Sequence, residues 1–269
     1  MKIIWLGQAG LLFETGHRRI IIDPYLSNNV QSYEPNKKRR VPIEVRYLRI
    51  RPDVIICTND RLDHMDVETL NYYMADAAGV LVLGPDSCIQ RLRLYGGNNT
   101  YVRFNPGTEW TLGKLRLRAV CAETTDPHAI GVVMDAENKR YYVAGDTLYN
   151  DRVLDSLPDA DYEAVFLPIG GYDDKMNAAD ATRMAARIRT RYAVPYGFGM
   201  FDTLNGTGFH HPGAVIPRPY KPLPFCRKAA VSPDEPDASD EPDISDEPDG
   251  ETAESAEAVQ ASAPALQSR

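Results

Sequence analysis

Short apolar runs alternate with turn residues along most of the chain and predict many short strands. Gly16 fits a hairpin turn between the second and third of these runs, Leu11–Glu14 and Arg19–Ile22. The fourth run, Asp53–Cys57, is almost wholly apolar, as expected of a strand covered on both faces. The predicted strands are Lys2–Leu6, Leu11–Glu14, Arg19–Ile22, Asp53–Cys57, Gly79–Leu83, Asn105–Trp110, Lys114–Val120, Ala129–Asp135, Arg140–Ala144, Ala164–Pro168 and Tyr192–Pro195.

Three segments have the helical spacing of apolar residues: Val67–Ala77, Ser87–Tyr95 and Asn177–Thr190. The last is the strongest, because Asn177 is a good N-cap residue and Asp180 follows three residues later. Strands thus come first in hairpins and then alternate with helices, and the pattern repeats after about residue 105. This order favours an α/β protein of four layers, an αββα sandwich with two mixed sheets between helices.

The last forty residues have a different composition. The sequence Asp-Glu-Pro-Asp occurs three times at a six-residue period, beginning at Asp234, Asp240 and Asp246. Proline blocks regular structure and the carboxylates repel one another, so we expect a disordered acidic tail over 230–269 after a folded domain over 1–229. Such a tail is interpreted either as a solubilising extension or as a docking segment for an unknown partner.

Charge and cysteine content exclude several classes of protein. The net charge of −8 comes mostly from the tail. A nucleic-acid-binding protein would need a basic face, and the sequence gives no sign of one. The basic run Lys37–Arg40 is typical of a solvated loop. Four widely spaced cysteines without a CxxC pair argue against a zinc ribbon or a disulfide framework. Neither a signal peptide nor an apolar run of membrane-spanning length is present, so a cytoplasmic protein without membrane contact is expected.

Several motifs together resemble the metallo-β-lactamase superfamily, in particular its L-ascorbate-6-phosphate lactonase branch. They are Trp5–Gly10, Ile22–Ser27, Thr125–Val132, Tyr142–Tyr149, Met176–Ala178 and Pro195 through Asp202. They occur in the family's order at plausible spacings over about residues 1–202. The resemblance implies an αββα sandwich and hydrolysis by a water that two divalent ions, zinc or manganese, convert to hydroxide.

The resemblance also implies ligand positions, and this chain fills them incompletely. The family's H-x-H-x-D-H motif corresponds to Asn59, Arg61, Asp63 and His64, and the bridging aspartate to Asp146. The third and last histidine positions fall at Thr124 and Gly197. Only Asp63, His64 and Asp146 are therefore retained as metal ligands and catalytic residues. These three residues suffice for one weakly held zinc or manganese ion at most. A site without any metal ion is equally compatible with this ligand set.

Arg61 decides between these outcomes, because a guanidinium is always charged and does not coordinate metals. If it points inward, it pairs with Asp63 or Asp146; if it points to solvent, a single ion has room beside Asp63 and His64. Packing or surface roles are favoured over metal ligation for four further side chains: Cys57, Cys121, His128 and Tyr196. The pair His210-His211 is interpreted as a surface loop.

Three hypotheses for function follow. The first is an inactive or weakly active hydrolase homologue that binds a small anionic or phosphorylated ligand through Arg61 and Asn59, helped by Arg39 and Arg40 in the loop over the site. The second is a single-metal lactonase or phosphodiesterase that uses Asp63, His64 and Asp146. The third is a non-enzymatic interaction scaffold with an acidic tail. A homo-oligomer is compatible with each.

Overall fold

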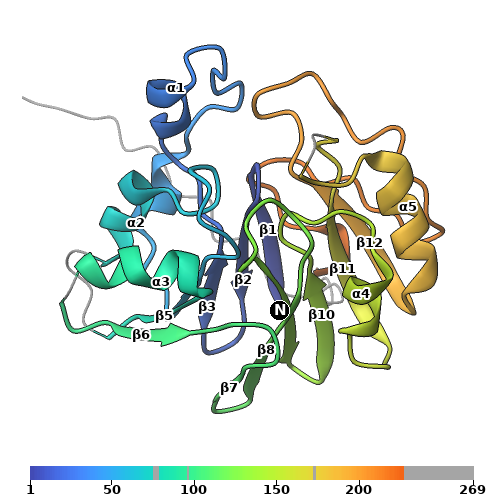
Figure 1. Cartoon of the computed structure of the whole chain (residues 1–269), viewed down its shortest axis with the longest axis horizontal. Coiled ribbons are helices and arrows are strands. Elements are labelled where there is room, and N and C mark those ends of the chain that lie inside the picture. Colours follow the sequence, from blue (N-terminus) through green and yellow to red (C-terminus); the bar gives the residue numbers. More distant parts are fainter. Residues whose placement is uncertain (75–78, 96, 172–173, 227–269) are drawn as a thin grey trace, which may run out of the picture. The chain divides into compact units, whose positions relative to one another are not determined.

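Two six-stranded sheets lie face to face in the computed structural model, which describes residues 1–74, 79–95, 97–171 and 174–226 (Figure 1). The acidic tail over 230–269 lies outside the described residues. The first sheet has the order β1-β2-β3-β4-β5-β6 and the second β12-β11-β10-β9-β8-β7. The strands of the first sheet are β1 (Lys2–Gly7), β2 (Gly10–Glu14), β3 (Arg19–Ile22), β4 (Val54–Ile56), β5 (Leu81–Gly84) and β6 (Thr100–Arg103). Those of the second are β7 (Glu109–Leu112), β8 (Leu115–Cys121), β9 (Ile130–Ala136), β10 (Lys139–Val143), β11 (Tyr162–Pro168) and β12 (Thr190–Tyr196).

Each sheet changes from antiparallel to parallel pairing. In the first sheet β1, β2 and β3 are antiparallel, whereas β3, β4, β5 and β6 run parallel. In the second sheet β7 to β10 are antiparallel, and β10, β11 and β12 run parallel. The parallel strands in each sheet therefore end at a common edge, and the loops that follow them are brought together there.

Helices cover the outer face of each sheet. Helices α2 (Val67–Met74) and α3 (Asp86–Leu92) lie against the first sheet, and α4 (Asp151–Asp155) and α5 (Ala178–Arg187) lie beside the second (Figure 1). A short helix α1 (Asn29–Tyr33) and 3-10 turns at Val45–Arg49, Arg93–Tyr95 and Pro224–Cys226 complete the described elements. None of the described helices combines the length and apolar character needed to cross a bilayer. The predicted αββα sandwich is confirmed.

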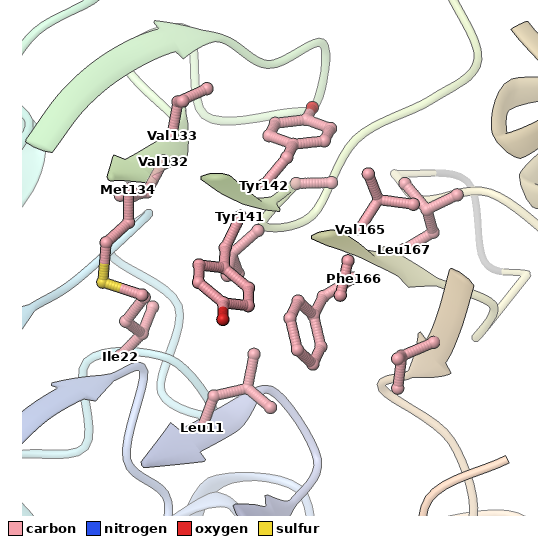
Figure 2. Close-up of a cluster of buried hydrophobic side chains, with 14 of the residues drawn as sticks. Leu11, Ile22, Val132, Val133, Met134, Tyr141, Tyr142, Val165, Phe166 and Leu167 are labelled. Atoms are coloured by element: carbon pink, nitrogen blue, oxygen red, sulfur yellow. The ribbon is translucent and has the colours of Figure 1, made fainter. Parts of the chain in front are cut away.

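Most of the first sheet is covered on both faces, by the second sheet on one side and by the helix layer on the other. Ile3 and Trp5 of β1 belong to the core between the sheets, whereas Ile4 and Leu6 pack with the helix layer. The second sheet supplies the opposite half of the core, and Figure 2 shows Tyr141 and Phe166 directed toward Leu11 while their neighbours point away. Because successive side chains point to opposite faces and both faces are buried, the strands are apolar runs in the sequence.

One predicted strand begins later in the structure, one predicted helix ends earlier, and one strand was not predicted. The predicted strand Asn105–Trp110 is wrong at its start, because Thr108 N–H donates to the Asn105 carbonyl in a turn and Gly107 has φ +89°. Strand β6, which the sequence pattern missed, is a half-exposed edge strand that pairs with β5 alone among the strands that the structure describes. The predicted helix Asn177–Thr190 begins after its Asn177 cap as expected but ends at Arg187, where Ile188 turns extended and buries its side chain.

Candidate functional site

The loops after four strands meet at the edge where the parallel strands end. Asp23 follows β3, the segment Thr58–His64 follows β4, Asp146 follows β10, and Lys175 lies in the connection after β11. Their side chains contact one another, so the site joins the two sheets. The fold thus positions residues that are far apart in sequence.

Gly145 allows the loop of Asp146 to approach the loop after β4. A Cβ atom at Gly145 would lie 2.7 Å from the Ile130 carbonyl oxygen and 3.0 Å from Thr58 Oγ1. Its φ of +67° is also a conformation that side chains disfavour. A glycine is therefore needed immediately before Asp146, and it brings this carboxylate beside His64.

Asp23 holds the imidazole of His64 in place. Its carboxylate accepts hydrogen bonds from Thr58 N–H (2.7 Å) and Thr58 Oγ1–H (2.6 Å), and its Oδ2 lies 2.9 Å from His64 Nδ1. Asp23 has φ +47°, an uncommon conformation for a residue with a side chain. Because Nδ1 is bound to Asp23, the other ring nitrogen, Nε2, is directed at Asp146.

Three cationic side chains surround a single oxygen of Asp146. Lys175 Nζ lies 2.9 Å from Asp146 Oδ2, His64 Nε2 lies 3.1 Å from it, and Arg61 Nε lies 3.7 Å from it. The side chains of Lys175 and His64 are only 2% and 0% exposed, so water screens these charges weakly. Asp146 is therefore the centre of a buried ion-pair cluster.

Arg61 points into this cluster and not toward solvent. Its guanidinium contacts Asp174 and lies 3.5 Å from Asp63 Oδ1, and Asp63 also accepts a hydrogen bond from Gln8 Nε2 at 2.8 Å. The side chain of Arg61 is 32% exposed, so it forms the solvent-facing end of the cluster. Arg61 therefore has the inward conformation of the two that the sequence allows, with Asp174 as an additional partner.

The electrostatics of the cluster favour the charged forms of His64, Asp146 and Lys175. Burial acts to lower the pKa of His64, but Asp146 and Asp23 outweigh it and raise this pKa to about 10. Burial acts in the opposite direction on Asp146, yet His64 and Lys175 hold the pKa of its carboxyl well below the usual range. The pKa of Lys175 is raised, because Asp146 and Asp63 outweigh its burial. His64 is consequently an imidazolium at neutral pH.

The charges of the cluster nearly cancel without any metal ion. Three cations, Arg61, His64 and Lys175, face four carboxylates: Asp23, Asp63, Asp146 and Asp174. A buried carboxylate without a partner would carry a large desolvation cost, which these pairs offset. The cationic charge that a metal centre would supply is thus already present in side chains.

The other residues assigned to ligand binding are engaged in local structure. Asn59 is fully buried, and its side-chain oxygen accepts the Arg61 N–H at 3.1 Å. Arg39 donates to the carbonyl oxygens of Val41 (2.7 Å) and Tyr25 (3.0 Å), and also to the Ser27 carbonyl and the Tyr220 hydroxyl. Arg39 therefore holds its own loop together, and Arg40 is exposed beside it. Binding of a small anion at Arg61 stays a prediction.

The two remaining positions assigned by resemblance provide no nitrogen ligand. Thr124 has a buried hydroxyl without a hydrogen-bond partner among the described residues. Gly197 has φ +72° and donates its N–H to the Gln8 carbonyl, so its backbone closes the loop after β12. A side chain at position 197 would be strained by this conformation.

The substitute ligands weighed from the sequence have other surroundings. Cys57 is buried in the helix-side core, which raises the pKa of its thiol, and His128 is exposed. Cys121 is half-buried at the end of β8, and Tyr196 is buried in the core between the sheets. The His211 Nδ1 accepts the Gly213 N–H, as in an ordinary loop.

These residues do not fit a dinuclear metal centre. Lys175 Nζ already lies at ion-pair distance from the carboxylate that would bridge two ions, and the Arg61 guanidinium lies beside it. Across the described ranges, no group of three His, Cys, Asp or Glu side chains is arranged to hold a metal ion. A divalent ion would also be repelled by both fixed cations.

Lys175, Asp174 and Asp23 are central to the site and were missed from the sequence. The signal was topological: Asp174 and Lys175 follow a predicted strand and precede the Asn177 cap, so they belong at the same edge as Asp146. The motif containing Asp23 was identified only as a landmark. Charge alone did not separate these residues from the many solvated charges of the chain.

Comparisons with known proteins agree with this fold. A family profile, the Beta-lactamase superfamily domain, matches residues 18–198. A UPF0173 protein of Pyrococcus furiosus is 27% identical over 203 residues, which cover 75% of this chain and 85% of the relative. A UPF0173 metal-dependent hydrolase of Deinococcus radiodurans is 26% identical over 217 residues, which cover 77% of this chain and 88% of the relative.

Solved structures with similar folds have low sequence identity. An isothiocyanate hydrolase from Delia radicum gut bacteria has a TM-score of 0.65 and 18% identity, with 84% of this chain and 99% of that chain covered. A metallo hydrolase of Ignicoccus hospitalis has a TM-score of 0.62 and 18% identity, with 82% and 96% covered. At this identity the likeness concerns the fold alone. The lactonase branch stays a prediction.

Proposed function

Since the chain belongs to the beta-lactamase superfamily, we propose that it is a member in which internal salt bridges replace the catalytic metal centre and metal-dependent hydrolysis is lost. The domain then acts through binding and not through catalysis. The observation that carries this proposal is the contact of 2.9 Å between Lys175 Nζ and Asp146 Oδ2, reinforced by Arg61.

The physical argument compares a metal ion with the side chains already present. A dication placed 4 Å from one fixed unit charge is repelled by roughly 8 kcal/mol at an effective dielectric of 20. Arg61 and Lys175 would both exert such repulsion, while the carboxylates that could offset it are already paired with them. The metal-bound hydroxide that relatives named metal-dependent hydrolases would use is then not generated.

The alternative of a single-metal hydrolase requires a rearrangement. An ion on Asp63, His64 and Asp146 would need Lys175 to leave Asp146 and His64 to lose its proton. Both changes act against the pairing that stabilises the cluster. The proposal therefore favours the metal-free state for this chain.

Metal analysis of the purified protein tests the proposal. Protein prepared without chelator, and protein incubated with excess Zn²⁺ or Mn²⁺ and then desalted, should both retain well under one ion per chain. Its melting temperature should also be unchanged by EDTA, because no bound ion contributes to stability. One or more tightly held ions per chain, together with a lower melting temperature in EDTA, would overturn the proposal.

A further inference from the structure

We infer that Lys175 is the built-in cation that occupies the metal position at Asp146, and that its removal opens a position for one divalent ion beside Asp146 and His64. The inference rests on the proposed function and assigns metal exclusion to one residue. It concerns Lys175 and not Arg61, because the two cations differ in distance and burial.

Lys175 has the closest contact with the central carboxylate. Its Nζ lies 2.9 Å from Asp146 Oδ2, against 3.7 Å for Arg61 Nε, and its side chain is 2% exposed, against 32% for Arg61. A compact ammonium group concentrates its charge at one point, whereas a guanidinium spreads it over a plane. Lys175 is therefore the better substitute for a small cation.

The chain around Lys175 is built to hold the side chain in this position. A Cβ atom at Gly170 would lie 2.8 Å from Lys175 Cδ, so a glycine at this position leaves room for the aliphatic stem. The backbone is fixed on the other side, because Met176 N–H donates to the Thr147 carbonyl and Gly171 N–H donates to the Met176 carbonyl. Lys175 is thus tied to the loop of Asp146 itself.

His64 and Asp146 already face each other beside the Lys175 ammonium group. Asp23 binds His64 Nδ1 and leaves Nε2 facing Asp146 Oδ2 at 3.1 Å, and this nitrogen makes no aligned hydrogen bond in the described residues. A carboxylate bound to the second ring nitrogen is the usual outer contact of a metal-binding histidine. Without Lys175, His64 Nε2 and Asp146 Oδ2 would remain close enough to bind the same ion.

The test compares metal uptake by wild-type protein and Lys175→Met. Methionine keeps most of the length of the side chain and removes its charge. We expect the variant to bind about one Zn²⁺ or Mn²⁺ per chain after desalting, whereas the wild type retains well under one. The readouts are metal content and the rise in melting temperature on adding the metal, so no enzyme assay is needed.

Two control variants test whether metal uptake depends on the loss of Lys175 and on the Asp146 carboxylate. Lys139→Met removes a lysine that pairs with Glu163 at the surface, and it should leave metal content at the wild-type level. The double variant Lys175→Met with Asp146→Asn removes the ligand together with the lysine, and it should lose the metal that Lys175→Met gains.

Each outcome decides the question. A folded Lys175→Met protein that stays metal-free overturns this inference and leaves the proposed function standing, whereas metal in the wild type overturns both. If Lys175→Met does not fold, the double variant provides the decision. Removal of both charges should restore folding if Lys175 serves to compensate Asp146, and failure to restore it would contradict the assignment.

Discussion

His64 shows how a single residue changes its chemistry when its neighbours change. Its pKa is raised to about 10 from an ordinary value of 6.5, because Asp146 and Asp23 outweigh burial. The contribution of protonated His64 to the stability of the fold is therefore complete below pH 6.5 and is lost as the pH rises toward 10. We expect the free energy of unfolding to fall over this window by an amount on the order of a few kcal/mol, measured by urea denaturation at several pH values.

Two histidine variants test this origin of the pH dependence. His64→Gln should be less stable than the wild type at pH 6.5 but should lose less stability between pH 6.5 and 10, because it has no proton to release. His17 is exposed in the turn before β3, so His17→Gln should keep the wild-type dependence. A profile for His64→Gln that runs parallel to the wild type would contradict the assignment of this titration.

Helix α5 illustrates the element scale, because one side chain fixes where it begins. The Asn177 Oδ1 accepts the Asp180 N–H at 2.9 Å, and the same helix anchors the connection that carries Lys175. Asn177→Ala should lower the free energy of unfolding by about 1 kcal/mol, seen as a lower midpoint in urea. Asn177→Asp retains a capping oxygen and should stay within a few tenths of a kcal/mol of the wild type; equal losses in both variants would argue against the cap.

The stability of the whole domain depends on the contact between its two sheets. Phe166 of β11 meets Phe13 of β2 edge to face, with ring centroids 5.6 Å apart, and Figure 2 shows its ring directed toward Leu11 of the other sheet. Phe166→Ala should cost about 3–5 kcal/mol of unfolding free energy, because it leaves a cavity between the sheets. Leu94 is 86% exposed, and Leu94→Ala should change stability by less than about 0.5 kcal/mol. Similar effects of the two substitutions would contradict this account of the core.

Particular elements show which parts of the fold local sequence patterns predict. The apolar runs at Lys2–Leu6 and Asp53–Cys57 were enough to place strands, because burial on both faces of a sheet imposes such runs locally. The edge strand β6 and the end of α5 were not placed correctly. Their limits depend on a neighbouring strand and on the burial of Ile188, which are tertiary contacts.

The sequence by itself determined the sandwich fold and the identity of the side chains at the family's ligand positions, including Arg61 in place of a histidine. These follow from local periodicity and from motif order. Only the tertiary structure decided that Arg61 points inward, that Asp23 orients His64, and that Lys175 lies at Asp146. Those facts depend on loops from two sheets meeting at one edge, and electrostatic pairing between them acts through space and not along the chain.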